Sequence, residues 1–191
     1  MRDIDVRIAL KSKTLSNFLS DKNALVIEEM GLFQGLSRID IAVVNGSLYG
    51  YEIKSESDTL YRLDSQLRYY RQVFDYLTFV VGRKHVEPIK NLLPEWCGLI
   101  VATPQNKSDI LHLKQVKRPK RNPEINSIAV AQLLWKDELL YLLNERGIKK
   151  GLSSKSKRDL WQLVADKYSV KELSAITRQL LKQRLDWRVA Q

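Results

Sequence analysis

Three residues that can support phosphodiester chemistry lie within one short stretch of the chain, residues 37–55. Asp40 comes before the dipeptide Asn45-Gly46, and Glu52 and Lys54 come after it. Two carboxylates suit a hard divalent cation, which takes oxygen ligands and shares its other positions with water and a phosphate. Such a cation would polarise a phosphoryl oxygen and activate a water, while the lysine would hold that water or the charge developing on the phosphate. These residues predict metal-assisted hydrolysis with Mg²⁺, for which Mn²⁺ could substitute.

The length of one loop decides whether these side chains converge. An Asn-Gly dipeptide between two runs rich in Val, Ile and Tyr is the strongest short-range signal for a β-hairpin. A two-residue loop would place Asp40 opposite Tyr51, on the wrong face of the hairpin. A three-residue loop over residues 45–47, with Gly46 in a left-handed bulge conformation, would place Asp40 opposite Glu52. The chemistry therefore predicts the three-residue loop.

The surroundings of the hairpin resemble the PD-(D/E)xK, or restriction-endonuclease-like, nuclease superfamily. Its pattern is an acidic residue ahead of a hairpin, an Asp on the first hairpin strand and Glu-x-Lys on the second. The matching residues here are Glu29 (or Glu28) in VIEEMGL, Asp40 in SRIDIAVV and Glu52-Ile53-Lys54 in YGYEIKS. We prefer Glu29 as the first acid. The residue before Asp40 is Ile39, where Pro is frequent in the superfamily.

This resemblance implies roles for the matching residues. Asp40, Glu52 and the main-chain carbonyl of Ile53 would ligate Mg²⁺, and Glu29 would bind or orient a second ion or its water. Lys54 would serve the nucleophile. Because Glu-x-Lys is a common tripeptide, an exposed and merely solvated pair is the alternative interpretation.

A further element, Gln66 and Tyr70 in SQLRYY, resembles the Gln-x-x-x-Tyr motif of some DNA-trimming members. Arg62, Gln66 and Tyr70 are four residues apart and would share one helix face. Gln66 and Tyr70 would then fix the scissile strand, and Arg62 would contact phosphate. An ordinary polar helix face explains the same spacing equally well.

The resemblance to the superfamily covers about residues 1–115. The run RIDIAVVNGSLYGYEIKSESDTLYRLDSQ, with PEWCG and LLWKDELL, is similar to a narrower group of bacterial proteins of undetermined role over nearly the whole chain.

Apolar periodicity predicts the elements that would position these residues. We expect helices near residues 6–20, 59–74 (with Asp58 as N-cap) and 86–93, and strands near 24–30, 77–81 and 99–102 besides the two hairpin arms. Helix, three strands, helix, strand is the order of the superfamily core. We therefore predict an α/β fold with a restriction-endonuclease-like core, a mixed sheet flanked by helices, over residues 1–116.

The second part of the chain is basic. The net charge is +10, and residues 117–191 hold 17 of the 32 basic residues but only 8 of the 22 acidic ones. Binding of such a segment to a polyanion releases condensed counterions, so nucleic acid is the simplest partner, with DNA favoured. A merely solvated basic surface is the alternative.

We expect a basic connector over residues 117–126 and a small all-helical domain over residues 127–191. Its predicted helices are residues 127–146, residues 156–168 and a third that begins with the capping box Ser169-Val-Lys-Glu172. Trp135, Trp161 and Trp187 should pack in its core. The candidate phosphate contacts are Lys149, Lys150, Lys155, Lys157 and Arg158.

The remaining composition indicates a cytoplasmic protein. Residues 1–13 carry charges throughout, which argues against a secretory signal, and no apolar run approaches membrane-spanning length. The single cysteine, Cys97, fits a reducing compartment and a place in the core.

The leading hypothesis is a Mg²⁺-dependent deoxyribonuclease. A double-strand cutter of this fold often needs two active sites, and so a homodimer or a larger complex. The alternatives are a nucleic-acid-binding protein of the same fold that does not cut, and a nuclease subunit that is active only in a larger defence or mobile-element complex.

Overall fold

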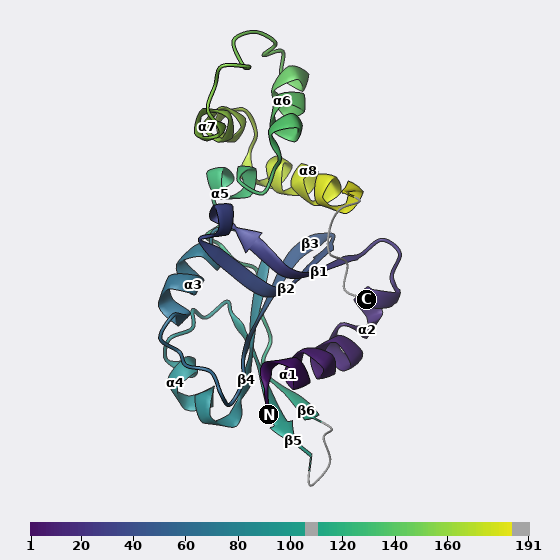
Figure 1. Ribbon diagram of the computed structural model, residues 1–191, viewed down its shortest axis with the longest axis vertical. Helices are drawn as coiled ribbons and strands as arrows, with labels where there is room; N and C mark the ends of the chain where they lie inside the picture. The colour runs from purple at the N-terminus through teal and green to yellow at the C-terminus, as the bar shows by residue number, and fades with distance from the viewer. Residues whose placement is uncertain (106–110, 185–191) are drawn as a thin grey trace.

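A computed structural model describes residues 1–105 and 111–184. Its centre is a six-stranded mixed sheet whose strands follow one another in chain order (Figure 1). The strands are β1 Leu25–Leu32, β2 Ser37–Asn45, β3 Ser47–Lys54, β4 Tyr76–Gly82, β5 Gly98–Pro104 and β6 Leu111–Lys117. The expected mixed α/β architecture, a sheet flanked by helices, is confirmed.

The middle of the sheet is parallel and its edges are antiparallel. β3 pairs with β4, and β4 with β5, in parallel, while the other neighbours are antiparallel. Parallel neighbours need crossover connections, which contain α3, Leu63–Tyr70, and α4, Val86–Lys90. The apolar sequence of β4, interrupted by the buried Thr78, follows from its place between two parallel neighbours and beneath helices on both faces.

Each face of the sheet has its own core. On one face, Val6, Ala9 and Leu10 pack onto β2, β3, β4 and β5. They belong to a helical segment made of α1, Asp3–Ala9, a π-helical turn, Leu10–Thr14, and α2, Ser16–Ser20. On the other face, α3 and α4 contribute side chains that include Tyr70 and Ile89. The single helix expected near residues 6–20 is therefore three short helical pieces. The first of them, α1, lies beside the hairpin (Figure 1).

The hairpin has the register that the three-residue loop requires. Val44 pairs with Leu48, and Gly46 has φ 63°. Only glycine adopts this left-handed region at little cost. Continuing the same register places Asp40 level with Glu52, as predicted.

The expected helix over residues 59–74 is shorter, and its expected N-cap is wrong. The Asp58 carboxylate accepts hydrogen bonds from Ser55 N (2.7 Å) and Ser55 Oγ (2.6 Å), and so closes the turn after β3. The helix α3 begins only at Leu63. The short helix expected over residues 86–93 is α4, and β6 is a strand that the sequence analysis did not predict.

Residues 127–184 are mainly helical, but the single helix expected over residues 127–146 is divided into two helices. α5 is Ser127–Ala131, α6 Lys136–Glu145, α7 Lys157–Lys167 and α8 Val170–Gln183. Trp135 separates α5 from α6 because its backbone is extended (ψ 162°). The backbone N–H of Trp135 donates a hydrogen bond to Glu138 Oε2 at 2.7 Å. The Ser169–Glu172 capping box is confirmed at the start of α8.

The tryptophans do not all lie where they were expected. Trp135 is 52 % exposed, with the Arg184 guanidinium 4.3 Å from its ring, so its predicted place in the core is wrong. Trp161 packs against the helical core, and Trp187 lies outside the described residues.

The helices α5 and α8 are also joined to the sheet. Ala129, Leu133 and Leu181 belong to the same buried cluster as α3 and α4. Arg178 of α8 forms an ion pair with the buried Asp75 carboxylate at 3.2 Å. The division into two domains at the basic connector stays a prediction. None of the helices in the described ranges is long and apolar enough to cross a membrane.

Candidate functional site

A polar cavity of about 500 Å³ lies between α1, α3 and the ends of β2 and β3. Six of the thirteen predicted site residues line it. These are Asp40, Glu52, Ile53, Lys54, Arg62 and Gln66. Among the predicted catalytic residues, Tyr70 lies directly behind Glu52, and Glu29 lies beside Asp40 in a network of ion pairs.

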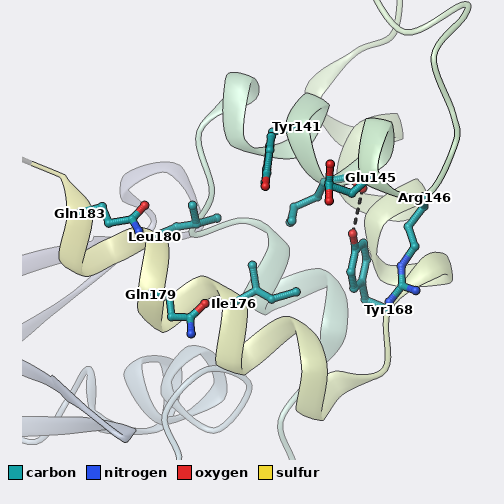
Figure 2. A pocket seen from close by; sticks show the side chains of 9 residues that line it. Tyr141, Glu145, Arg146, Tyr168, Ile176, Gln179, Leu180 and Gln183 are labelled. Atoms are coloured by element: carbon teal, nitrogen blue, oxygen red, sulfur yellow. Dashed lines mark hydrogen bonds between the residues drawn. The ribbon is translucent and has the colours of Figure 1, made fainter.

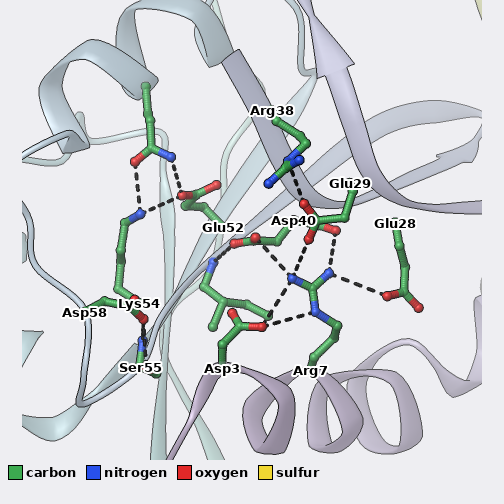
Figure 3. A network of polar contacts seen from close by, with 12 residues as sticks. Asp3, Arg7, Glu28, Glu29, Arg38, Asp40, Glu52, Lys54, Ser55 and Asp58 are labelled. Atoms are coloured by element: carbon green, nitrogen blue, oxygen red, sulfur yellow. Dashed lines mark hydrogen bonds and ion pairs between the residues drawn. The ribbon is translucent and has the colours of Figure 1, made fainter. Parts of the chain in front are cut away.

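Lys54 and Glu52 form a buried ion pair on β3. Lys54 Nζ lies 2.7 Å from Glu52 Oε1, and the residues are 7 % and 2 % exposed (Figure 3). Gln66 of α3 joins them, because its Oε1 accepts from Lys54 Nζ at 2.9 Å and its Nε2 donates to Glu52 Oε1 at 2.7 Å. Gln66 therefore fixes both the carboxylate and the ammonium group.

Tyr70 holds the other oxygen of Glu52. Its hydroxyl lies 2.8 Å from Glu52 Oε2 and 2.6 Å from the carbonyl oxygen of Arg38, so its single proton has two possible acceptors. Burial, followed by the negative charge of Glu52, raises the pKa of Tyr70. The tyrosine therefore stays a neutral hydrogen-bond donor. Gln66 and Tyr70, predicted to share a helix face, do lie together at this site.

Asp40 lies next to this group on β2. Its Oδ2 accepts a 2.6 Å hydrogen bond from Ile53 N, and its Oδ1 lies 3.2 Å from Arg7 Nη2. Burial, together with the charge of Glu52, raises the pKa of Asp40 to about 7. Burial also raises the pKa of Glu52, although the positive charge of Lys54 opposes this. The negative charge of Glu52 thus disfavours the ionisation of Asp40.

The sequence analysis missed Arg7. Its guanidinium lies in a cluster of carboxylates contributed by α1, β1 and β2, and its side chain is only 10 % exposed (Figure 3). Its Nη2 lies 2.7 Å from Glu29 Oε1, and its Nη1 donates to the carbonyl oxygen of Asp40 at 2.9 Å. The only local signal was Asp3, four residues earlier on the same helix face.

The two candidates for the first acid both lie in this cluster. Glu29 has φ 56°, a left-handed conformation rare for a non-glycine residue, and its Oε2 lies 2.6 Å from Arg38 Nε. Glu28 Oε1 lies 2.7 Å from Lys11 Nζ. Neither glutamate lines the cavity.

The donors at the cavity fit Mg²⁺ in chemistry and in charge. Two carboxylates and the Ile53 carbonyl are the oxygen ligands that hard cations prefer. Burial is the main cause of the raised pKa values of Asp40 and Glu52, and a bound cation would favour their ionised forms. Within residues 1–105 and 111–184, no three His, Cys, Asp or Glu side chains are grouped as a metal site would group them. A metal here would therefore depend on the carbonyl and on water to complete its coordination.

The predicted phosphate contacts lie in two places. Arg62 lines the cavity at the ends of β2 and β3. Lys149, Lys150 and Lys155 are exposed on the loop between α6 and α7, and Lys157 and Arg158 are exposed in the first turn of α7. In Figure 1 this loop lies at the end of the molecule, beyond α8 as seen from the sheet.

A second cavity, of about 630 Å³, contains none of the predicted site residues. It lies between α6, α8 and Tyr168, whose hydroxyl donates to the Leu142 carbonyl at 2.8 Å (Figure 2). Arg146 covers the Tyr168 ring at 4.1 Å, and aliphatic side chains such as Ile176 form much of the wall. Acid or base chemistry is therefore better placed in the cavity at β2 and β3.

Comparison with known proteins gives the family. The family model for bacteriophage P4 protein cII matches residues 3–189. The chain belongs to the bacteriophage P4 protein cII family. A curated member, protein cII of Enterobacteria phage P4, is 30 % identical over 185 residues, which are 96 % of this chain and 68 % of that protein. This membership fits a phage or mobile-element origin.

A solved structure is also similar to this member of the cII family. It is a Silicibacter pomeroyi protein of unknown function that is 18 % identical, with a TM-score of 0.40 over 68 % of this chain and 84 % of the other.

Proposed function

We propose that the protein is a metal-dependent nuclease that hydrolyses phosphodiester bonds, with DNA as the favoured substrate, and that its sheet and flanking helices are a restriction-endonuclease-like core. The observation that carries this proposal is the meeting of Asp40, Glu52, Lys54 and Gln66 at one polar cavity. These residues come from two strands and a helix. A buried Glu52 and a half-buried Asp40 beside a fixed lysine cost free energy, and such groups cluster at functional sites.

Asp40, Glu52 and the Ile53 carbonyl would hold Mg²⁺ or Mn²⁺. When bound, the ion supplies positive charge that polarises a phosphoryl oxygen and activates a water. The chain's own residues would fix the geometry, because Ile53 N orients Asp40 at 2.6 Å and Tyr70 orients Glu52 at 2.8 Å. Such preorganisation lets the site meet developing charge without rearranging.

Lys54 would act directly on the reacting groups. An ammonium group has three donors, and Lys54 directs one to Glu52 and one to Gln66. The third can donate to the attacking water or to a phosphate oxygen. Arg62 at the same cavity, and the exposed cations between α6 and α7, would hold the phosphate backbone of the substrate.

The decisive experiment incubates labelled linear, circular and single-stranded DNA with Mg²⁺ or Mn²⁺, for wild type and Lys54→Ala. Cleavage by wild type that is lost in Lys54→Ala supports the proposal and shows the polarity of attack. An unchanged rate in Lys54→Ala would contradict it.

One observation favours a second function, a nucleic-acid-binding protein that does not cut. Every carboxylate oxygen of Asp40 and Glu52 already has a protein partner, and Arg7 supplies positive charge beside Asp40. This function requires the same DNA affinity with Mg²⁺ and with EDTA, and no cleavage. Because the family includes a phage protein, a nuclease subunit that cuts only inside a larger complex is a third candidate. Its mark would be cleavage only after addition of a neighbouring gene's product.

A further inference from the structure

The guanidinium of Arg7 is the centre of the acidic cluster beside the cavity. It contacts four carboxylates, with Nη2 2.7 Å from Glu29 Oε1, 3.2 Å from Asp40 Oδ1 and 3.3 Å from Asp3 Oδ1, and Nη1 3.5 Å from Glu28 Oε2 (Figure 3). One nitrogen thus bridges the carboxylate of Asp40 and that of Glu29. A second metal ion would need these same two carboxylates as ligands.

Packing holds Arg7 in this place. It lies on α1 between residues that are buried in the core, since Val6 is 0 % and Ala9 is 6 % exposed. Its charge is also permanent. A guanidinium stays protonated in proteins, so this positive charge is always present. A second cation could therefore enter only by displacing a fixed positive charge, which it would repel.

We infer that the guanidinium of Arg7 takes the place of a second divalent ion, so that the cavity binds one metal ion. This inference rests on the proposed metal-dependent function and specifies it. Asp40, Glu52 and the Ile53 carbonyl would hold the single ion, and Glu29 serves to hold Arg7 and Arg38 instead of a metal. The predicted role of Glu29 toward a second ion is thereby replaced by a role in binding the two arginines.

The test is the stoichiometry of Mn²⁺ binding, measured by calorimetric titration and by equilibrium dialysis without substrate. Wild type should bind one Mn²⁺ per chain. Arg7→Gln removes the charge and should bind two, because Glu29 Oε1 and Asp40 Oδ1 then lose the cation that they share. Arg7→Lys keeps a cation at the position and should bind one.

The matched control is Arg38→Gln. Arg38 also contacts Glu29, at 2.6 Å, but its side chain is 68 % exposed, and the carbonyl that accepts from Tyr70 is unchanged. It should bind one Mn²⁺ like wild type. Circular dichroism verifies folding, and if Arg7→Gln does not fold, the wild-type stoichiometry decides alone.

The outcomes separate this inference from the function on which it rests. Two Mn²⁺ ions bound by wild type, or one by folded Arg7→Gln, would overturn the role of Arg7 and leave a metal-dependent nuclease intact. Wild type that binds no Mn²⁺ would overturn both.

Discussion

Lys54 Nζ lies 2.7 Å from Glu52 Oε1 in the interior of the protein, and Gln66 contacts both groups. The two residues are separated by one position on β3, so they share the strand face that meets the cavity. A buried ion pair of this kind adds little net stability, because desolvation offsets the attraction. In the proposed nuclease, this arrangement would fix the ammonium group and the carboxylate before a substrate binds.

Lys54→Ala should abolish cleavage and retain DNA binding. The loss of a positioned donor to developing charge is worth about 10²-fold or more in rate. Turnover of labelled DNA and fluorescence anisotropy measure the two properties separately. Lys22→Ala, at an exposed position remote from the cavity lining, is the control and should match wild type. A parallel loss of binding and turnover in Lys54→Ala would show that the lysine only holds DNA.

Asp40→Asn should stabilise the metal-free protein increasingly as the pH rises. The pKa of Asp40 is raised to about 7, so the folded state binds its proton more tightly than the unfolded state does. The unfolding free energy of wild type should therefore fall between about pH 4 and pH 7, by at most roughly 4 kcal/mol from this group. Urea titrations in EDTA over this range should show the difference between variant and wild type growing with pH. The exposed Asp64→Asn is the control, and a pH-independent difference for Asp40→Asn would refute the argument.

Tyr70→Phe should destabilise the fold and impair the site. It removes the hydroxyl that contacts Glu52 Oε2 and the Arg38 carbonyl, and leaves a buried acceptor without its donor. The expected cost is about 1–3 kcal/mol of unfolding free energy. Tyr61→Phe makes the same chemical change at a side chain that is 93 % exposed and should be silent. Equal stability of the two variants in urea would exclude the proposed role of the Tyr70 hydroxyl.

Replacing Lys149, Lys150 and Lys155 by Ala should weaken DNA binding without changing the metal site. Each lost phosphate contact should lower the slope of log affinity against log salt by about 0.9. Anisotropy titrations at several salt concentrations measure this slope. A control that replaces the exposed residues Lys22, Lys84 and Lys114 removes the same charge from other surfaces. If both triple variants lose affinity equally, the effect is net charge and the loop between α6 and α7 is not an interface.

The hairpin could be predicted because local rules decide it, and its register followed from the requirement that Asp40 and Glu52 share a face. Side chains alternate along a strand, and the left-handed conformation needed in the loop is one that Gly46 adopts. The extent of α3 could not be predicted, because Asp58 contacts Ser55 instead of the helix end. The break between α5 and α6 at Trp135 could not be predicted either, because the apolar periodicity continues across it.

Arg7 escaped prediction because its role is a matter of tertiary packing. The sequence distance from Arg7 to Asp40 is 33 residues, and no local pattern states that α1 covers the end of the hairpin. The strand β6 left only a weak alternation of apolar and polar residues, as is common for an exposed edge strand. The acids and the lysine of the hairpin could be found from their spacing, whereas the arginine that contacts Asp40 could not.

The central claim is tested most directly by DNA cleavage with Mg²⁺ or Mn²⁺, comparing wild type, Lys54→Ala and Asp40→Ala, with Mn²⁺ binding measured on the same samples. The account predicts cleavage by wild type alone, Mn²⁺ binding by wild type and Lys54→Ala, and neither property in Asp40→Ala. Wild-type rates of cleavage in both variants would contradict it.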